Sequence, residues 1–392
     1  MLSIAIIGTG NISVQHINGY LAFPQRCKIT HLVDIFPEKA EKKNAEYKLG
    51  AAVSASHKDI LDADIDLVSI CTPPFCHAQI AIDFLNAGKN VLVEKPMAAS
   101  LEECDAMICA AEKSGKIFSV IAQNRFRDPI SGLKKVLDSK LIGKVVHAQV
   151  DSLWWRGHSY YDLWWRGTWE KEGGGCTLNH AVHHIDMLCW MLGLPKKVNA
   201  VISNTSHDNA EVEDISAAVL QYDGGLCAKG AIAQVTSSVI HHGEEQQIIF
   251  QGEKARISAP WKITAQIAQP NGFPAKEQND ELINQLNNFY ESLPKFAHTM
   301  HEGQIDNVLA AIETGSKPLI GGEDGRQTIE LITAIYKAGT EEKAVALPIK
   351  KDDPFYTVNG IMEKVPRFYK KAASVNDQGG SITLGGNYGK NV

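Results

Sequence analysis

The stretch LSIAIIGTGNIS, from Leu2 to Ser13, decides the fold. Leu2 to Ile7 is a β-branched run that predicts a buried strand, and Ser13 to Leu21 predicts the helix that follows it. The residues that join them, Gly8-Thr9-Gly10-Asn11-Ile12-Ser13, have the setting of a dinucleotide-binding turn. Glycines there permit a tight bend and close approach to a pyrophosphate, and the helix N-terminus supplies N–H donors. Ser13 stands at the third glycine position and is small enough for close helix–strand packing.

Asp34 indicates which dinucleotide the turn would take. It ends the second predicted strand, Lys28 to Val33, 26 positions after Gly8. A carboxylate at this position accepts hydrogen bonds from the ribose hydroxyls and repels a 2′-phosphate. We therefore expect NAD rather than NADP. The alternative is a glycine turn with an unrelated surface aspartate.

Strands and helices alternate through the first third of the chain. The predicted strands continue at Asp66 to Cys71, Asn90 to Val93 and Ile117 to Ala122, and the helices at Pro37 to Leu49, His77 to Ala87 and Leu101 to Ser114. Apolar strands separated by helices imply a parallel, doubly wound α/β sheet covered on both faces. We place this domain at residues 1–125.

The predicted pattern of secondary structure changes after residue 125. Longer strands follow at Val145 to Leu153, Ile215 to Tyr222, Ala228 to Thr236 and Gln246 to Gln251, and helices return at Ile283 to Phe296, Gln304 to Thr314 and Gly325 to Ala338. Turn signals between the strands predict an α+β domain with a large, mostly antiparallel open sheet over residues 126–366. Residues 367–392 are expected to form an arm or tail.

Composition limits the class of protein. The chain has 392 residues, of which 44% are apolar, so two domains are expected. Its formal net charge is −6 and it has no stripe of basic residues, so we do not expect it to bind nucleic acid. No apolar run approaches the ~18 residues of a membrane span, and the start lacks the pattern of a signal peptide. We expect no membrane association, a cytoplasmic location, and eight reduced cysteines.

Two loops are expected at the carboxyl edge of the first sheet, where ligands bind in such folds. Thr72-Pro73-Pro74 follows one strand and precedes His77, and Glu94-Lys95-Pro96 follows the next. The prolines would fix a loop and Lys95 would place a cation at the cofactor crevice. Alternatively, the prolines only end the strands and Lys95 is a solvated surface residue.

The segment from Gly173 to Gly193 carries most of the chemistry. If a helix begins near Asn179, then Asn179, His183, Asp186 and Trp190 share one face, and three of these four residues are polar. His180 and His184 form a second pair with zinc-compatible spacing, but Ala181 stands where a zinc protease motif has glutamate. We expect no metal, with His180 exposed to solvent and His184 used in packing or substrate hydrogen bonding.

Six of the seven tryptophans lie between Trp154 and Trp190, and the pentapeptide LWWRG occurs at 153–157 and again at 163–167. Indole rings stack on sugar C–H faces, and Arg166 beside Trp165 can hold hydroxyls or an anionic group. A tryptophan-rich core corner or subunit interface is the alternative for any single ring.

Together these motifs resemble the Gfo/Idh/MocA oxidoreductases, and the resemblance extends through Glu323-Asp-Gly-Arg326 and Leu347-Pro-Ile349. It implies a Rossmann domain, NAD, and an α/β domain whose open sheet forms a homodimer or homotetramer. His183 would be the general base and Lys95 would stabilise the alkoxide. Asn179, which departs from the family's common aspartate, would be the third catalytic residue and would hydrogen-bond the substrate oxygen or orient His183. The implied cofactor contacts are Gly8, Thr9, Gly10, Asn11, Ile12, Asp34, Thr72, Pro73, His77, Glu94, Lys95 and Gln123. The implied substrate contacts are Lys95, Arg125, Trp165, Arg166, Asn179, His183, His184 and Asp186.

Arg125 keeps two interpretations, contact with nicotinamide and substrate or a salt bridge between domains. For the whole chain, the leading hypothesis is NAD-dependent oxidation of a ring secondary alcohol of a sugar, anhydrosugar or inositol to a ketone. The rivals are a glycosidase that acts by transient C3 oxidation and elimination, and a non-catalytic sensor of NAD or sugar.

Overall fold

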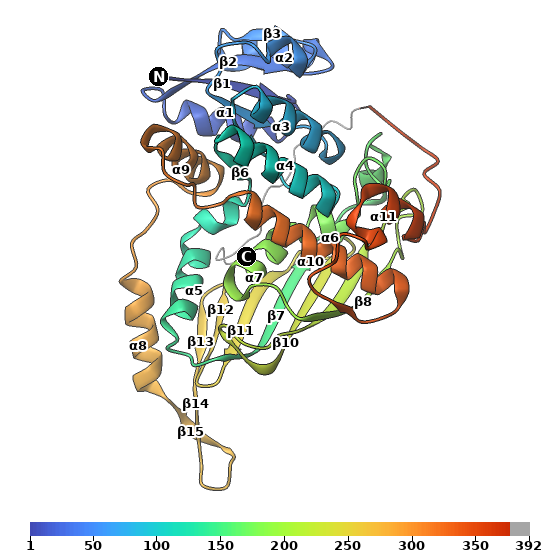
Figure 1. Cartoon of the computed structure of the whole chain (residues 1–392). Helices are drawn as coiled ribbons and strands as arrows, with labels where there is room; N and C mark the ends of the chain where they lie inside the picture. The colour runs from blue at the N-terminus through green and yellow to red at the C-terminus, as the bar shows by residue number, and fades with distance from the viewer. Residues whose placement is uncertain (377–392) are drawn as a thin grey trace.

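The N-terminal sheet is parallel and doubly wound. The computed structural model describes residues 1–376 of the chain, and its first sheet has the strand order β3-β2-β1-β4-β5-β6 (Figure 1). The strands are β1 Leu2–Ile7, β2 Cys27–Val33, β3 Ala52–Ser54, β4 Leu67–Ile70, β5 Asn90–Val93 and β6 Phe118–Val120. Every neighbouring pair is parallel. The predicted Rossmann architecture is therefore confirmed.

Helices cover both faces of this sheet, as the continuous apolar strands require. They are α1 Ser13–Leu21, α2 Pro37–Tyr47, α3 His77–Asn86 and α4 Leu101–Ser114. Along β1, Ile4 and Ile6 pack into one core cluster while Ala5 and Ile7 pack into the other, because successive side chains point to opposite faces. Short β3 was missed by sequence periodicity, since three residues carry too little pattern.

The second sheet has eight strands in the order β13-β12-β11-β7-β10-β9-β8-β16. Their bounds are β7 Val145–Leu153, β8 Lys197–Ser203, β9 Ile215–Gln221, β10 Cys227–Ser238, β11 Gln246–Gly252, β12 Arg256–Ala259, β13 Lys262–Thr264 and β16 Val345–Ala346. All pairs are antiparallel except β7 with β10. The prediction of a mostly antiparallel open sheet is confirmed.

Helices pack on one face of the second sheet. The helices of this half are α5 Asp128–Ser139, α6 Cys176–Asn179, α7 Val182–Leu192, α8 Asp280–Glu291, α9 Met300–Thr314, α10 Gly322–Glu341 and α11 Val358–Lys364. Helix α7 contacts β7, and α10 contacts both α7 and β8. A separate hairpin, β14 Gln266–Ala268 with β15 Pro274–Gln278, extends away from the body of the molecule (Figure 1).

Helix α9 lies far along the chain but beside the N-terminal sheet (Figure 1). Ile305, Val308 and Leu309 of α9 belong to the core cluster that contains Ile17 and Tyr20 of α1. The close approach depends on Gly19, because a Cβ there would lie 2.4 Å from Ile305 Cδ1. The division at residue 125 stays a prediction, and α9 shows that the two halves are interleaved.

The last described residues support the tryptophan-rich loop, residues 154–169. Val375 donates its N–H to Asp162 O at 2.7 Å and accepts from Trp164 N at 2.9 Å. Asn209 Oδ1 accepts from the main chain of Ala372 and Ala373. Residues 367–376 of the predicted arm thus lie against the body of the protein, and residues 377–392 lie outside the described residues.

Candidate cofactor and substrate site

The glycine turn has the backbone that a dinucleotide site requires. Gly8 has φ +88°, and a Cβ there would lie 2.8 Å from Cys71 O, whereas a Cβ at Gly10 would meet nothing within 4 Å. Gly8 is thus required by the fold, and Gly10 leaves open space in front of Asn11, Ile12 and the N-terminus of α1. A bound pyrophosphate fits that space.

Asp34 is held at the end of β2 by the same turn. Its Oδ2 accepts from Thr9 N at 2.8 Å and from Thr9 Oγ1 at 2.7 Å, and its Oδ1 accepts from Phe36 N at 3.0 Å. Oδ1 therefore keeps acceptor capacity for a ribose hydroxyl. The predicted Asp34 therefore stands oriented beside Thr9.

Buried polar atoms without partners mark the rest of the crevice. Within residues 1–376, Thr72 Oγ1 and Gln123 Oε1 are buried and accept or donate no hydrogen bond. Such atoms are uncommon and indicate groups that a ligand satisfies. With Pro73 in the same loop as Thr72, the set fits a dinucleotide. His77 differs, because its two ring nitrogens each lie 2.8 Å from a carbonyl oxygen, one of Thr72 and one of Pro96, so it ties two loops together.

Lys95 and His183 come together, as predicted, at the junction of the two halves. Both line a pocket whose other walls come from β6 and the residues after it, from α7 and from α10. Lys95 Nζ donates to the main-chain oxygen of Asn179 at 3.3 Å. Burial lowers the pKa of Lys95, although the charge of Glu94 opposes that change. The Lys95 amine and the His183 imidazole thus line one pocket.

The His183 imidazole is neutral at ordinary pH. Burial and the neighbouring charge of Lys95 hold its pKa well below its usual range. A neutral ring has a free lone pair on one nitrogen, so it can accept a proton from a hydroxyl. His183 lies in the first turn of α7, and Asp186 and Trp190 follow on that helix.

The prediction that a helix begins near Asn179 is wrong. Asn179 ends the short helix α6, and α7 begins at Val182, so Asn179 does not share a continuous helical face with His183. The Asn179 side chain turns back to the glycine run, with Nδ2 donating to Gly174 O at 3.0 Å. Its main-chain carbonyl, rather than its side chain, meets Lys95.

A buried carboxylate that the sequence analysis missed holds the start of α6. Glu213 is fully buried and accepts from Gly175 N, Thr177 N and Tyr336 OH, each at 3.0 Å. Burial raises the pKa of Glu213 to about 7. A Cβ on Gly175 would lie 1.8 Å from Glu213 O, which explains a glycine there. Residue 213 lies too far along the chain for local pattern to reveal this contact.

Arg125 forms a buried salt bridge, one of its two expected interpretations. Its Nε and Nη2 donate to the Asp186 carboxylate at 2.9 and 2.7 Å, and Nη1 donates to Asp324 at 2.7 Å. This bidentate pair joins the end of the first sheet to α7 and α10. Contact of Arg125 or Asp186 with substrate stays a prediction.

The six clustered tryptophans range from buried to exposed. Trp154 and Trp169 are buried, Trp155 is exposed, and Trp164, Trp165 and Trp190 are half-buried. The Arg166 guanidinium lies 4.2 Å from the ring centres of both Tyr160 and Trp165, and it pairs with buried Glu172 at 2.9 Å. Arg166 and Glu172 are near enough to Lys95 to shift its pKa in opposite directions.

The two remaining histidines do not face water. His180 is 7% exposed and packs near Trp154 and Tyr160, so its expected exposure to solvent is wrong. The break between α6 and α7 turns its ring inward. His184 is fully buried, and burial lowers its pKa to about 3. Its packing role agrees with the expectation, and its contact with substrate stays a prediction.

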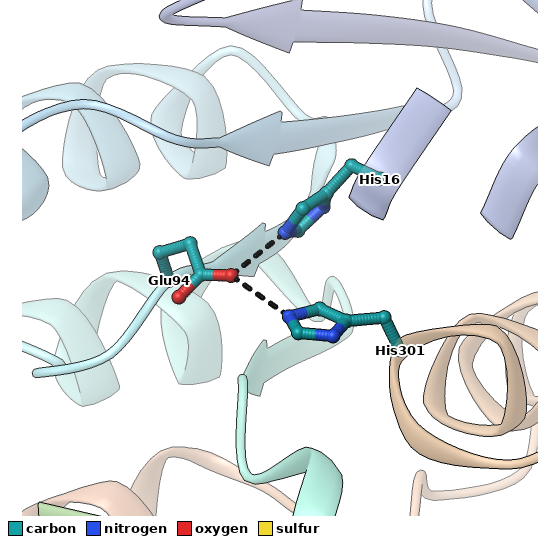
Figure 2. A group of neighbouring side chains, drawn as sticks. All are labelled: His16, Glu94 and His301. Atoms are coloured by element: carbon teal, nitrogen blue, oxygen red, sulfur yellow. Dashed lines mark hydrogen bonds and ion pairs between the residues drawn. The ribbon is translucent and has the colours of Figure 1, made fainter. Parts of the chain in front are cut away.

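Glu94 lies between two imidazoles rather than in open crevice. Its carboxylate accepts from His16 Nε2 at 2.9 Å and from His301 Nε2 at 3.2 Å (Figure 2). His301 comes from α9, and neither histidine was singled out by the sequence analysis. Their spacing in the chain gives no local signal.

The family assignment rests on both halves. Residues 2–122 match the model "Oxidoreductase family, NAD-binding Rossmann fold", and residues 130–258 match "GFO/IDH/MocA C-terminal domain". The chain belongs to the GFO/IDH/MocA oxidoreductase family, whose N-terminal domain binds NAD. Within residues 1–376, no helix is long and apolar enough to cross a membrane.

Individual relatives share about a quarter of the residues. The chain is 25% identical over 349 residues to an inositol 2-dehydrogenase of Rhizobium meliloti, covering 87% of this chain and 98% of the relative. It is 31% identical over 211 residues to a levoglucosan dehydrogenase of Pseudarthrobacter phenanthrenivorans, covering 52% and 54%. The WlbA dehydrogenase of Bordetella pertussis, solved with NADH and UDP-GlcNAcA, superposes with a TM-score of 0.74 at 27% identity over 89% of this chain and 99% of that one.

We predict opposite effects of alanine at the two glycines of the turn. Gly8→Ala should cost about 2 kcal/mol of unfolding free energy, because an L-residue is forced to positive φ against Cys71. Gly10→Ala should leave stability nearly unchanged, since its Cβ has room, but weaken NAD binding by about tenfold or more. Urea unfolding and NAD titration measure the two. Equal stability of both variants would contradict the interpretation of Gly8.

We predict that His184 makes stability fall in acid. Its folded pKa is about 3, below the unfolded value near 6.5, so the unfolded chain binds the extra proton between these values. This contribution is complete above pH 6.5 and is lost as the pH falls, by ~2 kcal/mol between pH 7 and pH 5. In His184→Leu the decline in unfolding free energy should be smaller by that amount. The exposed His158, replaced by leucine, is the control.

Proposed function

We propose that the protein oxidises a ring secondary alcohol of a sugar, anhydrosugar or inositol to a ketone with NAD as the hydride acceptor. The observation that supports this most directly is the pairing of Lys95 and a neutral His183 in one cavity at the end of the Rossmann sheet. The names of the inositol and levoglucosan dehydrogenases among the relatives support the substrate class.

Bound NAD supplies an electrophilic nicotinamide carbon that takes a hydride. Gly10, Asn11 and Ile12 would hold its pyrophosphate, Asp34 its ribose, and Thr72, Pro73 and Gln123 the nicotinamide half. The chain's own task is to remove the hydroxyl proton and to stabilise the charge that develops on oxygen.

His183 would accept that proton, because its ring is neutral and lies in the cavity. Lys95 would donate a hydrogen bond to the developing alkoxide and so lower the energy of the transition state. Its contact with the Asn179 carbonyl would orient the ammonium group before the substrate arrives. Asn179 would then act through the position of its main chain, with no negative side chain to raise the pKa of His183.

The stacked group of Tyr160, Trp165 and Arg166 would form the wall against the sugar ring. Its aromatic faces suit C–H groups, and the guanidinium suits ring oxygens. The ion pair with Glu172 would keep the guanidinium in place without net charge. Asp186 lines the same pocket and is held by Arg125, and His184 is buried on α7.

The test is reduction of NAD by the purified protein with a panel of cyclic polyols. At least one inositol, pyranose or anhydrosugar should give NADH, and His183→Ala should lower kcat by about a hundredfold or more while the Kd of NAD stays within about threefold. His158→Ala is the matched control. A folded, NAD-saturated protein that oxidises none of the panel would contradict the proposal. Release of an aglycone without net NADH would favour the glycosidase alternative.

A cytoplasmic homodimer or homotetramer joined through the second sheet is part of the proposal. Val201, Val219 and Ile232 are 69%, 41% and 42% exposed and share one face of adjacent strands, as the pairing of Val201 with Ala217 and of Val219 with Gln234 requires. Eight cysteines without a disulfide are usual in a reducing compartment.

We predict that charge on this face dissociates the oligomer. Val219→Lys should shift the mass measured by light scattering towards the monomer, because an ammonium group would be buried against apolar residues of the partner copy. Lys229→Ala, on the same sheet, is the control. A monomeric wild-type protein would refute the expected assembly.

A further inference from the structure

His16, Glu94 and His301 form a buried cluster drawn from three elements. Glu94 follows β5, His16 lies in α1 and His301 in α9, and the residues are 3%, 0% and 4% exposed. One carboxylate oxygen, Oε1, receives both imidazole Nε2 atoms, at 2.9 and 3.2 Å (Figure 2). The cluster therefore joins the helix of the glycine turn to the residue that precedes Lys95.

Proton positions in this cluster are consistent with hydrogen bonding alone. If both Nε2 atoms carry a proton, His16 Nδ1 is an acceptor and can receive the Ser69 hydroxyl at 3.1 Å. Ser69 Oγ in turn accepts from Tyr20 OH at 2.6 Å. By distance the three ligand atoms could hold a metal ion, but a metal would need both Nε2 atoms deprotonated. Because an ionised carboxylate only accepts hydrogen bonds, the contacts of both Nε2 atoms with Glu94 Oε1 favour the hydrogen-bonded cluster.

The second oxygen of Glu94 reaches the catalytic side of the cluster. Oε2 accepts from the main-chain N–H of Lys95 at 3.1 Å. On the other side of Lys95, His77 Nδ1 lies 2.8 Å from Pro96 O. The Lys95 main chain is therefore fixed from both sides, and its Nζ reaches Asn179 O.

The charge of Glu94 is also fixed. Burial alone would raise the pKa of its carboxyl, but the hydrogen bonds from His16 and His301 hold it well below its usual range. The charges that face Lys95 are Glu94 and Glu172, which favour its ammonium form, and Arg166, which opposes it. His183 faces Lys95 from α7 and is neutral. Glu94 is thus an anion held at the base of the lysine.

We propose that His16, Glu94 and His301 are positioning residues that set the place and charge of Lys95 and couple it to the seating of the cofactor on α1. The proposal rests on the proposed function of Lys95. Movement of α1 when a pyrophosphate binds at its N-terminus would reach Glu94 through His16, one turn along the helix.

The test uses two replacements of His301 that carry the same amide donor at different positions. The amide of His301→Gln takes the place of Nε2 and keeps the hydrogen bond, whereas that of His301→Asn takes the place of Nδ1 and loses it. We expect kcat to fall about tenfold or more in His301→Asn and to stay within about threefold in His301→Gln, with the KM of the polyol little changed. His298→Gln, which removes the half-buried partner of Glu302 and lies three residues before His301, is the control and should match wild type.

A second measurement needs no substrate. A small amine-reactive reagent modifies Lys95 only in its neutral form. The modification rate, followed by mass spectrometry against pH, therefore gives the pH midpoint at which the Lys95 ammonium group loses its proton. In Glu94→Gln the midpoint should move to lower pH, because the anion that favours the ammonium group is gone. This result would stand even if no polyol were oxidised, so failure of the proposed function is separable from failure of the network.

Three outcomes would overturn the proposal. Equal turnover in His301→Asn, His301→Gln and wild type would show that the donor is not used. An unchanged pH midpoint of Lys95 modification in Glu94→Gln would show that the charge of Glu94 does not affect the protonation of Lys95. Stoichiometric metal in the purified protein that is lost in His301→Asn would make the cluster a metal site instead.

Discussion

The contact between the Lys95 ammonium group and the main-chain oxygen of Asn179 is the point on which the site depends. Lys95 belongs to the first sheet, and Asn179 ends a short helix of the second half. Both residues of this contact are held in place. Glu94 and His77 bond to the main chain around Lys95, and Glu213 bonds to the start of α6, the helix that Asn179 ends. Segments from the two halves of the chain are thereby aligned at the atoms that would act on substrate.

Buried carboxylates do most of this alignment. Glu213 receives two main-chain N–H groups and a tyrosine hydroxyl, Glu94 receives two imidazoles, and Asp186 receives a bidentate guanidinium. Each buried charge is costly unless it is fully hydrogen-bonded. Loss of a partner would remove part of that hydrogen bonding inside the protein, so the surroundings of the cavity tolerate little movement.

The sequence was informative where chemistry and local pattern coincide. The glycine turn and Asp34 were predicted because a strand, a turn and a helix must follow each other in order for such a site to form, whereas the roles of Lys95 and His183 were implied by the family resemblance and stay predictions. The parallel sheet followed from apolar strands without alternation. His16, Glu213 and His301 were missed because their partners lie 78, 36 and 207 residues away, and contact at such separations has no local signature. The break after Asn179 was missed for a related reason, since only Glu213 and the glycine run make a separate short helix favourable.

The tryptophan-rich loop has a consequence for how the protein is made. Trp164 and Asp162 bond to Val375, and Trp169 donates to Pro366 O at 3.0 Å, so the tryptophan-rich loop rests on residues near the end of the described chain. During synthesis, this loop gains that support only after the 197 residues that separate Trp169 from Pro366 have emerged from the ribosome. The core beside α1 is likewise completed only when α9, Met300–Thr314, has emerged, so the two parts of the site form together rather than in chain order.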